Sequence, residues 1–176
     1  MVREWAGWIA DTRLSHVFQE ISWVIPVSQS MHIVCVAIVF ASASMLGTRL
    51  LGFGASGRTV SQLVGSLIPW MYGALAVLLL TGLVQTIAEP LRQFVTPEFW
   101  WKMLMVICEL LLTVWFARAV RRDPGRWDAA PTRPKGARLF AVVFVGLWVA
   151  IVVCGRLIGY TWSYYAWIFR FPAVHG

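Results

Sequence analysis

Four long stretches of the chain are almost free of charged residues, and each is long enough to cross a bilayer. They cover about residues 23–50, 62–88, 98–120 and 139–160. A transmembrane helix needs about 20 predominantly apolar residues to cross a hydrocarbon layer of about 30 Å. No stretch shows the alternation of a membrane β-barrel strand. The pattern therefore predicts an all-α integral membrane protein, a four-helix bundle occupying residues 23–160.

The segments that flank the bundle are amphipathic or aromatic. Residues 1–22 mix tryptophans and aliphatic residues with charges at a roughly helical period, which is typical of a short helix in the membrane interface. Residues 161–176 are rich in Trp, Tyr and Phe, and predict an interfacial belt or a second surface helix. Both segments are expected to lie at the surface of the bilayer.

Composition narrows the class of protein further. The chain is 59% hydrophobic and only 13% charged, against about 25% charged in soluble domains. Its three cysteines are scattered through apolar runs, which argues against a disulfide framework. Nucleotide-binding glycine motifs, zinc spacings and a Ser–His–Asp set are all missing from the sequence.

The basic residues indicate the topology rather than a nucleic-acid partner. The loops after the first and third spans hold nine of the fifteen Lys and Arg residues, seven of them between residues 118 and 138. The loop after the second span holds Arg92 beside two glutamates. The positive-inside rule then places the two basic loops in the cytoplasm and both termini on the outer side of the membrane.

The strongest chemical signal is His32. It lies in a run from Ile21 to Thr48 that contains no Asp, Glu, Lys or Arg. An ionisable side chain at membrane depth is costly, so it marks a functional site by default. The first and third spans run in the same direction, and their residue counts place His32 and Lys102 at a similar depth in the outer half of the bilayer.

Two more charged residues complete the predicted site. Glu109 follows Lys102 by about two helical turns on nearly the same face, and Arg156 lies near the outer end of the fourth span. We expect His32, Lys102, Glu109 and Arg156 to point into the bundle, because facing lipid would cost more. Each residue also has a purely structural interpretation. In these, His32 is a packing histidine, Lys102 extends to the headgroups, Glu109 is a hydrogen-bonded core carboxyl, and Arg156 is an interfacial anchor.

A buried imidazole suits haem iron, copper or a proton path. For haem b, His32 is the candidate axial ligand, because His16 and His175 lie in the flanking segments and cannot supply a second histidine from a span. The sixth ligand is then Lys102, a methionine, water or nothing, with Met103 and Met105 as the candidate methionines. Arg156 or Lys102 would alternatively pair with a haem propionate.

Copper is the competing metal. Met31 and Cys35 are four residues apart on one helical face, and His32 lies three residues from Cys35. Soft sulfur ligands combined with an imidazole suit Cu(I). Methionine and cysteine are also ordinary fillers of apolar helices, however.

A set of short motifs in order resembles an uncharacterised bacterial inner-membrane family, domain-of-unknown-function family 6644, over about residues 26–120. The sequence departs from that family at Thr48, where an acidic residue is usual. The motifs are His32-Ile33-Val34, Thr48-Arg49-Leu50-Leu51-Gly52, Pro69-Trp70, Thr81-Gly82-Leu83, Ala88-Glu89-Pro90 and Phe99-Trp100-Trp101-Lys102-Met103-Leu104.

More distantly, the span-one histidine, the Thr-Gly pair and the span-three lysine resemble HemJ-type protoporphyrinogen oxidases and CopD-type copper proteins. The HemJ likeness implies a haem b held by His32 and Lys102. Fold-level likeness does not transfer the oxidase activity.

These observations predict a haem b protein of the inner membrane, passing electrons between a periplasmic redox partner and quinone, or anchoring another membrane or periplasmic subunit. Whether the chain is itself an enzyme stays open. The alternatives are a non-catalytic accessory subunit of a larger complex, a copper carrier and a HemJ-like oxidase. The expected surroundings are the lipid bilayer and a protein partner, with no nucleic acid.

Overall fold

A computed structural model describes residues 2–53, 57–129 and 136–168, and over these residues the ordered elements are all helices. Four of the helices, α3, α4, α6 and α8, are long and apolar enough to cross a membrane. The prediction of an all-α, multi-pass membrane four-helix bundle is thus confirmed. The helices are α1 Val2–Ala10, α2 Arg13–Glu20, α3 Val24–Leu51, α4 Val60–Ala88, α5 Pro90–Phe94, α6 Pro97–Arg122, α7 Pro124–Asp128 and α8 Ala137–Ile168.

Local sequence signals set most of the helix ends. Gly52 ends α3 with a φ of 92°, a left-handed conformation that glycine adopts without a steric penalty. Thr59 and Gln62 form a capping box at the start of α4, and Pro97 occupies the first turn of α6. Helix α8 continues to Ile168, past the predicted end at residue 160, because the next proline is Pro172.

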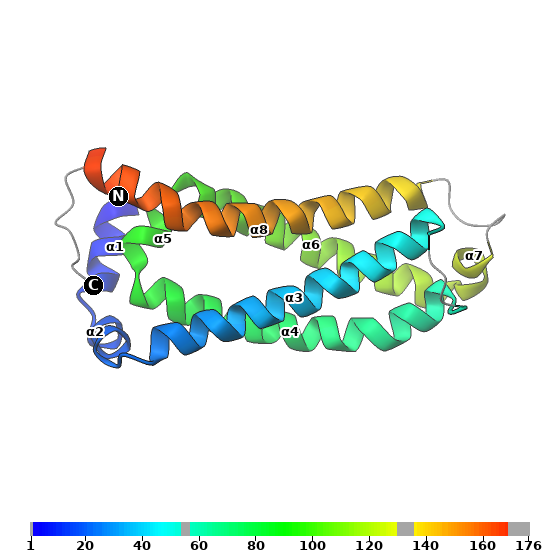
Figure 1. Cartoon of the computed structure of the whole chain (residues 1–176), viewed down its shortest axis with the longest axis horizontal. Coiled ribbons are helices and arrows are strands. Elements are labelled where there is room, and N and C mark those ends of the chain that lie inside the picture. The colour runs from blue at the N-terminus through cyan, green and yellow to red at the C-terminus, as the bar shows by residue number, and fades with distance from the viewer. Residues whose placement is uncertain (1, 54–56, 130–135, 169–176) are drawn as a thin grey trace.

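The four long helices form a closed ring of neighbours with unequal contacts. Helix α3 packs on α4 and α8, and α6 packs on α8, whereas α4 and α6 touch much less. Helices α3 and α6 therefore lie diagonally across the bundle. Figure 1 shows α1, α2 and α5 gathered at one end of the bundle and α7 at the other. We call these the α5 end and the α7 end.

The buried apolar core is concentrated toward the α7 end. Its last members toward the α5 end are Cys35 on α3, Ala74 on α4, Phe116 on α6 and Ile151 on α8. Nearer the α5 end, the buried residues of the described chain are a mixture of hydrophobic ones, such as Phe99 and Ile158, and polar ones, such as Ser28 and Thr81. Large aliphatic side chains are exposed along all four long helices, which indicates contact with lipid.

The N-terminal segment contains two short helices rather than the single one predicted. The break falls at Thr12, whose side chain accepts a hydrogen bond from the Ser15 amide and so starts α2. Helix α1 packs on α5 and α2 on α4. Gln19 Nε2 donates to the carbonyl of Ala88 over 2.7 Å and thereby satisfies the end of α4. The segment thus covers the α5 end of the bundle.

The basic linker after α6 is tied to the start of α4. Asp128 Oδ1 accepts from the Ser61 amide over 2.9 Å, and Oδ2 accepts from Ser61 Oγ over 2.6 Å. Partial burial opposes ionisation of Asp128, but hydrogen bonds from Ser61, Thr59 and Val60 outweigh it and lower the pKa of the carboxyl. Residues 130–135 of this linker and 169–176 of the predicted tail lie outside the described residues.

Replacing Asp128 should destabilise the α7 end in a pH-dependent way. A lowered folded-state pKa stabilises the fold above the unfolded pKa, and this contribution is lost as the pH falls through the folded pKa. We expect Asp128→Ala to lower the free energy of unfolding by about 1 kcal/mol near pH 7, with the difference shrinking in acid. Thermal unfolding of the detergent-solubilised protein at several pH values measures this. Asp11→Ala, at an exposed position, is the control. An equal loss of unfolding free energy in both variants would contradict a stabilising contact between Asp128 and Ser61.

Candidate cofactor-binding site

The half-buried His32 is oriented by a threonine from the neighbouring helix. Its Nδ1 lies 2.8 Å from Thr81 Oγ1 on α4. Thr81 Oγ1 in turn donates its proton to the carbonyl of Val77, at 2.8 Å. Because that proton is already used, the hydroxyl oxygen accepts from His32, and Nδ1 carries the ring proton. The lone pair of Nε2 is then free to bind a metal.

The same region holds α3 close to α4. Ser28 Oγ donates to the carbonyl of Thr81 over 3.2 Å. Gly82 lies against the imidazole, since a Cβ added there would be in van der Waals contact with His32 Cε1 at 3.7 Å. Thr81 thus anchors the ring, and Gly82 lies beside it. The sequence motif contained this pair, but its contact with His32 depends on the rotation of α4.

Lys102 reaches the interior from the diagonally opposite helix. It is half-buried and lies against α8, where a Cβ added at Gly155 would be 3.7 Å from its Nζ. The charge of Lys102 acts on His32, so both side chains lie in the same half of the bundle, although α3 and α6 themselves do not touch.

Glu109 points into the bundle, as predicted. It is only 1% exposed, and neither carboxyl oxygen has a hydrogen-bond partner among the described residues. Thr113 Oγ1 and Trp148 Nε1 are also buried without a partner. Lys102 lies beside Gly155, and Phe116 packs 6.5 Å from Phe144, so the antiparallel register puts Glu109 near the level of Trp148. Polar groups thus continue from the site into the core.

Arg156 does not join the interior group. It is exposed, its Nη2 donates to Tyr160 Oη over 3.2 Å, and its guanidinium carbon lies 5.2 Å from the Tyr160 ring centre. The expectation that it points inward is wrong for this structure, because a partner one turn along its own helix holds it at the surface. Its arrangement matches the interfacial-anchor alternative.

A different arginine, Arg92 of α5, lies over the site. Its Nη1 donates to Glu89 Oε2 over 2.7 Å, and its Nη2 would lie 3.3 Å from a Cβ at Gly159. Gly155 and Gly159 are one helical turn apart, so Lys102 and Arg92 lie one above the other along the same face of α8. Sequence reasoning treated Arg92 only as a loop charge; the single basic residue between two spans was the available signal.

The residues considered for copper are not gathered in this way. Met31 is 49% exposed, whereas Cys35 is 8% exposed and belongs to the apolar core. Over the described part of the chain, no group of three or more His, Cys, Asp and Glu residues is placed to hold a metal ion. Met31 and Cys35 thus face different surroundings, because one is exposed and the other is buried in the core.

Comparison with known proteins places the chain in a family but adds no function. No curated protein and no solved structure matches it. The model of a family described as "Family of unknown function (DUF6644)" matches residues 5–161, which include α3, α4, α6, most of α8 and the His32 and Lys102 positions. The chain therefore belongs to the DUF6644 family of unknown function.

Proposed function

We propose that the chain binds one haem b between α3 and α6, near the α5 end, and serves in electron transfer across part of an inner membrane. The observation that carries this proposal is the orientation of His32 by Thr81, which directs Nε2 away from that hydrogen bond, with Lys102 facing the same half of the interior from the diagonal helix. His32 would hold the iron, and Lys102 would either be a second ligand or pair with a propionate. When bound, the haem iron supplies one-electron chemistry.

The surroundings of the two residues fit such a group. The fully buried apolar cluster ends at Cys35 and Ile151, and half-buried hydrophobic residues such as Met105 and Val106, one turn from Lys102, pack on it beyond and give the site an apolar lining. Gly82 and Gly155 lie against His32 and Lys102. Arg92 takes the place that we expected for Arg156, as a cation that would pair with a propionate.

The placement suggests the direction of electron transfer. The basic loops lie at the α7 end, which the positive-inside rule assigns to the cytoplasm, so the site lies toward the periplasm. A haem there is within reach of a periplasmic redox protein and of quinone in the outer leaflet. We accordingly propose an electron-transfer or anchor subunit with both termini in the periplasm.

Absorption spectra of the purified chain, oxidised and then reduced, test the proposal. We expect a Soret band, α and β bands on reduction, and one haem b per chain by pyridine haemochrome assay. Metal analysis of the same sample measures copper. Expression with added haem precursor and no Soret band would overturn the proposal, and stoichiometric copper without haem would favour the carrier alternative.

Thr81 offers a sharper test of the geometry. Thr81→Val removes the acceptor for His32 Nδ1 and leaves the ring free to rotate or change tautomer. Loss of such a partner typically weakens metal binding by roughly 10–100-fold, so we expect faster haem loss to apomyoglobin and a shifted midpoint potential. Thr81→Ser should keep both properties.

Thr86→Val is the matched control, because Thr86 Oγ1 donates only to the carbonyl of Gly82 on its own helix. Wild-type haem retention in Thr81→Val would show that this hydrogen bond does not orient a ligand. Equal haem loss in Thr86→Val would attribute the effect to α4 in general.

A second proposal is an accessory subunit within a larger membrane complex. The observation that favours it is a set of exposed aromatic rings near the α5 end, which offers a surface for lateral contact with another subunit as well as for the membrane interface. These residues are Trp5, Trp8, Trp23, Trp100 and Trp101, each more than half exposed. Purification of a stable, haem-loaded monomer would count against this role.

A further inference from the structure

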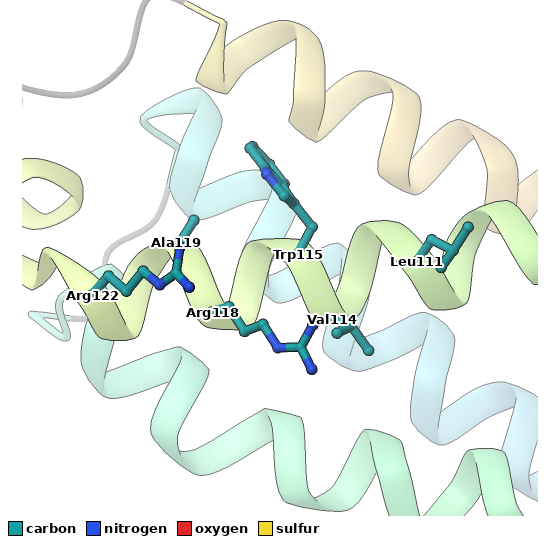
Figure 2. A pocket seen from close by; sticks show the side chains of 6 residues that line it. All are labelled: Leu111, Val114, Trp115, Arg118, Ala119 and Arg122. Atoms are coloured by element: carbon teal, nitrogen blue, oxygen red, sulfur yellow. The ribbon is translucent and has the colours of Figure 1, made fainter.

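A shallow groove follows one face of α6 toward the α7 end (Figure 2). It encloses about 450 Å³, and its lining residues recur at intervals of three and four, as one helical face requires. The half toward the middle of the bundle is apolar, and the other half carries two arginines. The lining residues are Leu111, Val114, Trp115, Arg118, Ala119 and Arg122.

The charged half of the groove is built for an anion. Arg118 and Arg122 are exposed, lie one helical turn apart, and form no ion pair with a described residue. The two acidic residues of the adjoining linker are engaged elsewhere: Asp123 accepts from the Arg126 amide over 3.2 Å, and Asp128 accepts from Ser61. Guanidinium groups of this kind match the geometry of a phosphate.

The apolar half has a preformed wall. The Trp115 ring packs 6.5 Å from the Trp127 ring in an edge-on arrangement and 5.5 Å from the Phe140 ring. These contacts hold the indole in place while leaving it 53% exposed, and Leu111 is 64% exposed. An aromatic ring fixed in this way presents a rigid apolar surface at little entropic cost.

The length of the groove matches one leaflet of a bilayer. Leu111 and Arg122 are about 16 Å apart along the helix axis at about 1.5 Å per residue. This is roughly half of a hydrocarbon layer of about 30 Å. With the two arginines at headgroup level, Leu111 lies near the middle of the bilayer.

We propose that this groove binds an anionic phospholipid of the surrounding bilayer. Its phosphate lies between Arg118 and Arg122, and one acyl chain lies along Leu111 and Trp115. Basic pockets on the cytoplasmic side of membrane proteins bind anionic headgroups in this manner. A zwitterionic lipid binds less well, because its own ammonium group competes with the arginines. The site is more than two helical turns from Lys102 and does not depend on haem binding.

Native mass spectrometry of the full-length protein in a neutral detergent tests the site, with phosphatidylglycerol and phosphatidylcholine as the two probes. The test variant is Arg118→Gln/Arg122→Gln. The control is Arg121→Gln/Arg126→Gln, which removes the same charge from exposed residues outside the groove. At roughly fivefold per basic residue, we expect the test variant to bind phosphatidylglycerol roughly 30-fold more weakly. The control should change much less, because Arg121 and Arg126 do not line the groove.

Several results would overturn the site. Equal losses in both double variants would mean diffuse attraction, and equal affinity for both lipids would mean that the headgroup is not recognised. Displacement of phosphatidylglycerol by millimolar inorganic phosphate would make free phosphate the occupant. Circular dichroism and size exclusion check folding. If the double variant does not fold, Trp115→Ala is tested instead. Unchanged phosphatidylglycerol binding in that variant would mean that Trp115 does not contact the acyl chain and would overturn the site.

Discussion

His32→Ala protein is expected to purify without haem, with no Soret band above background, while retaining its helical content. The expectation follows from the donor set, because His32 is the single histidine within the four spans and its Nε2 lone pair has no other ligand role. The loss of haem should be close to complete, since Lys102 alone would have to hold the iron. Absorption spectra, pyridine haemochrome content and far-ultraviolet circular dichroism of the variant measure both properties.

The neighbouring Met31→Ala provides the control, because Met31 is on the same helix and 49% exposed. It should retain haem at the wild-type level. The variant His32→Gly tests the same ligand by chemical rescue. Free imidazole added to this variant should restore haem binding and its Soret band. Full haem content in His32→Ala would mean that the ligand lies elsewhere, and Met103 or Met105 would become the next residues to replace.

Among the substitutions discussed for the transmembrane helices, we expect Gly47→Leu to be the most destabilising. Gly47 lies on α3 against α8, and a Cβ built there would be only 2.6 Å from Val145 Cγ2 and 3.7 Å from the carbonyl oxygen of Ala141. A leucine would have to push the two helices apart. Overpacking of this kind typically costs about 1–3 kcal/mol, and close helix approach through small residues is a main source of association in membranes.

Thermal unfolding or titration with a denaturing detergent measures this loss. Gly73→Leu is the matched control, since nothing lies within 4 Å of a Cβ at Gly73 on α4. Val145→Ala should recover part of the stability in the Gly47→Leu background, because it removes the methyl group that clashes. Equal stability of the Gly47 and Gly73 variants would contradict a close α3–α8 contact at this level.

Much of the candidate site was predictable because depth in a membrane follows from residue counts. His32 and Lys102 were matched by position along two parallel spans, and Glu109 was expected inside because a charge facing lipid is costly. Arg156 has the same cost in principle, but it lies near the end of its span. There the long side chain and Tyr160 hold it at the surface.

The partners of these residues were not predictable in the same way. Thr81 and Arg92 reach the site because α4 and α5 have particular rotations and crossing points, which a count along the chain does not contain. The division of residues 1–22 into two helices also depends on one local feature, the Thr12 cap. In the structure, α1 and α2 together cover the α5 end of the bundle.

The sequence alone determined the class of protein and the number of spans, and it predicted the depth of each ionisable group, because the bilayer acts on every residue through its distance from the surface. The tertiary structure alone decided which side chains lie next to one another. It placed Arg156 at the surface, Arg92 beside Gly159 and Thr81 beside His32. The physical reason is that helix rotation and close packing through small residues such as Gly47 depend on contacts between segments far apart in the chain.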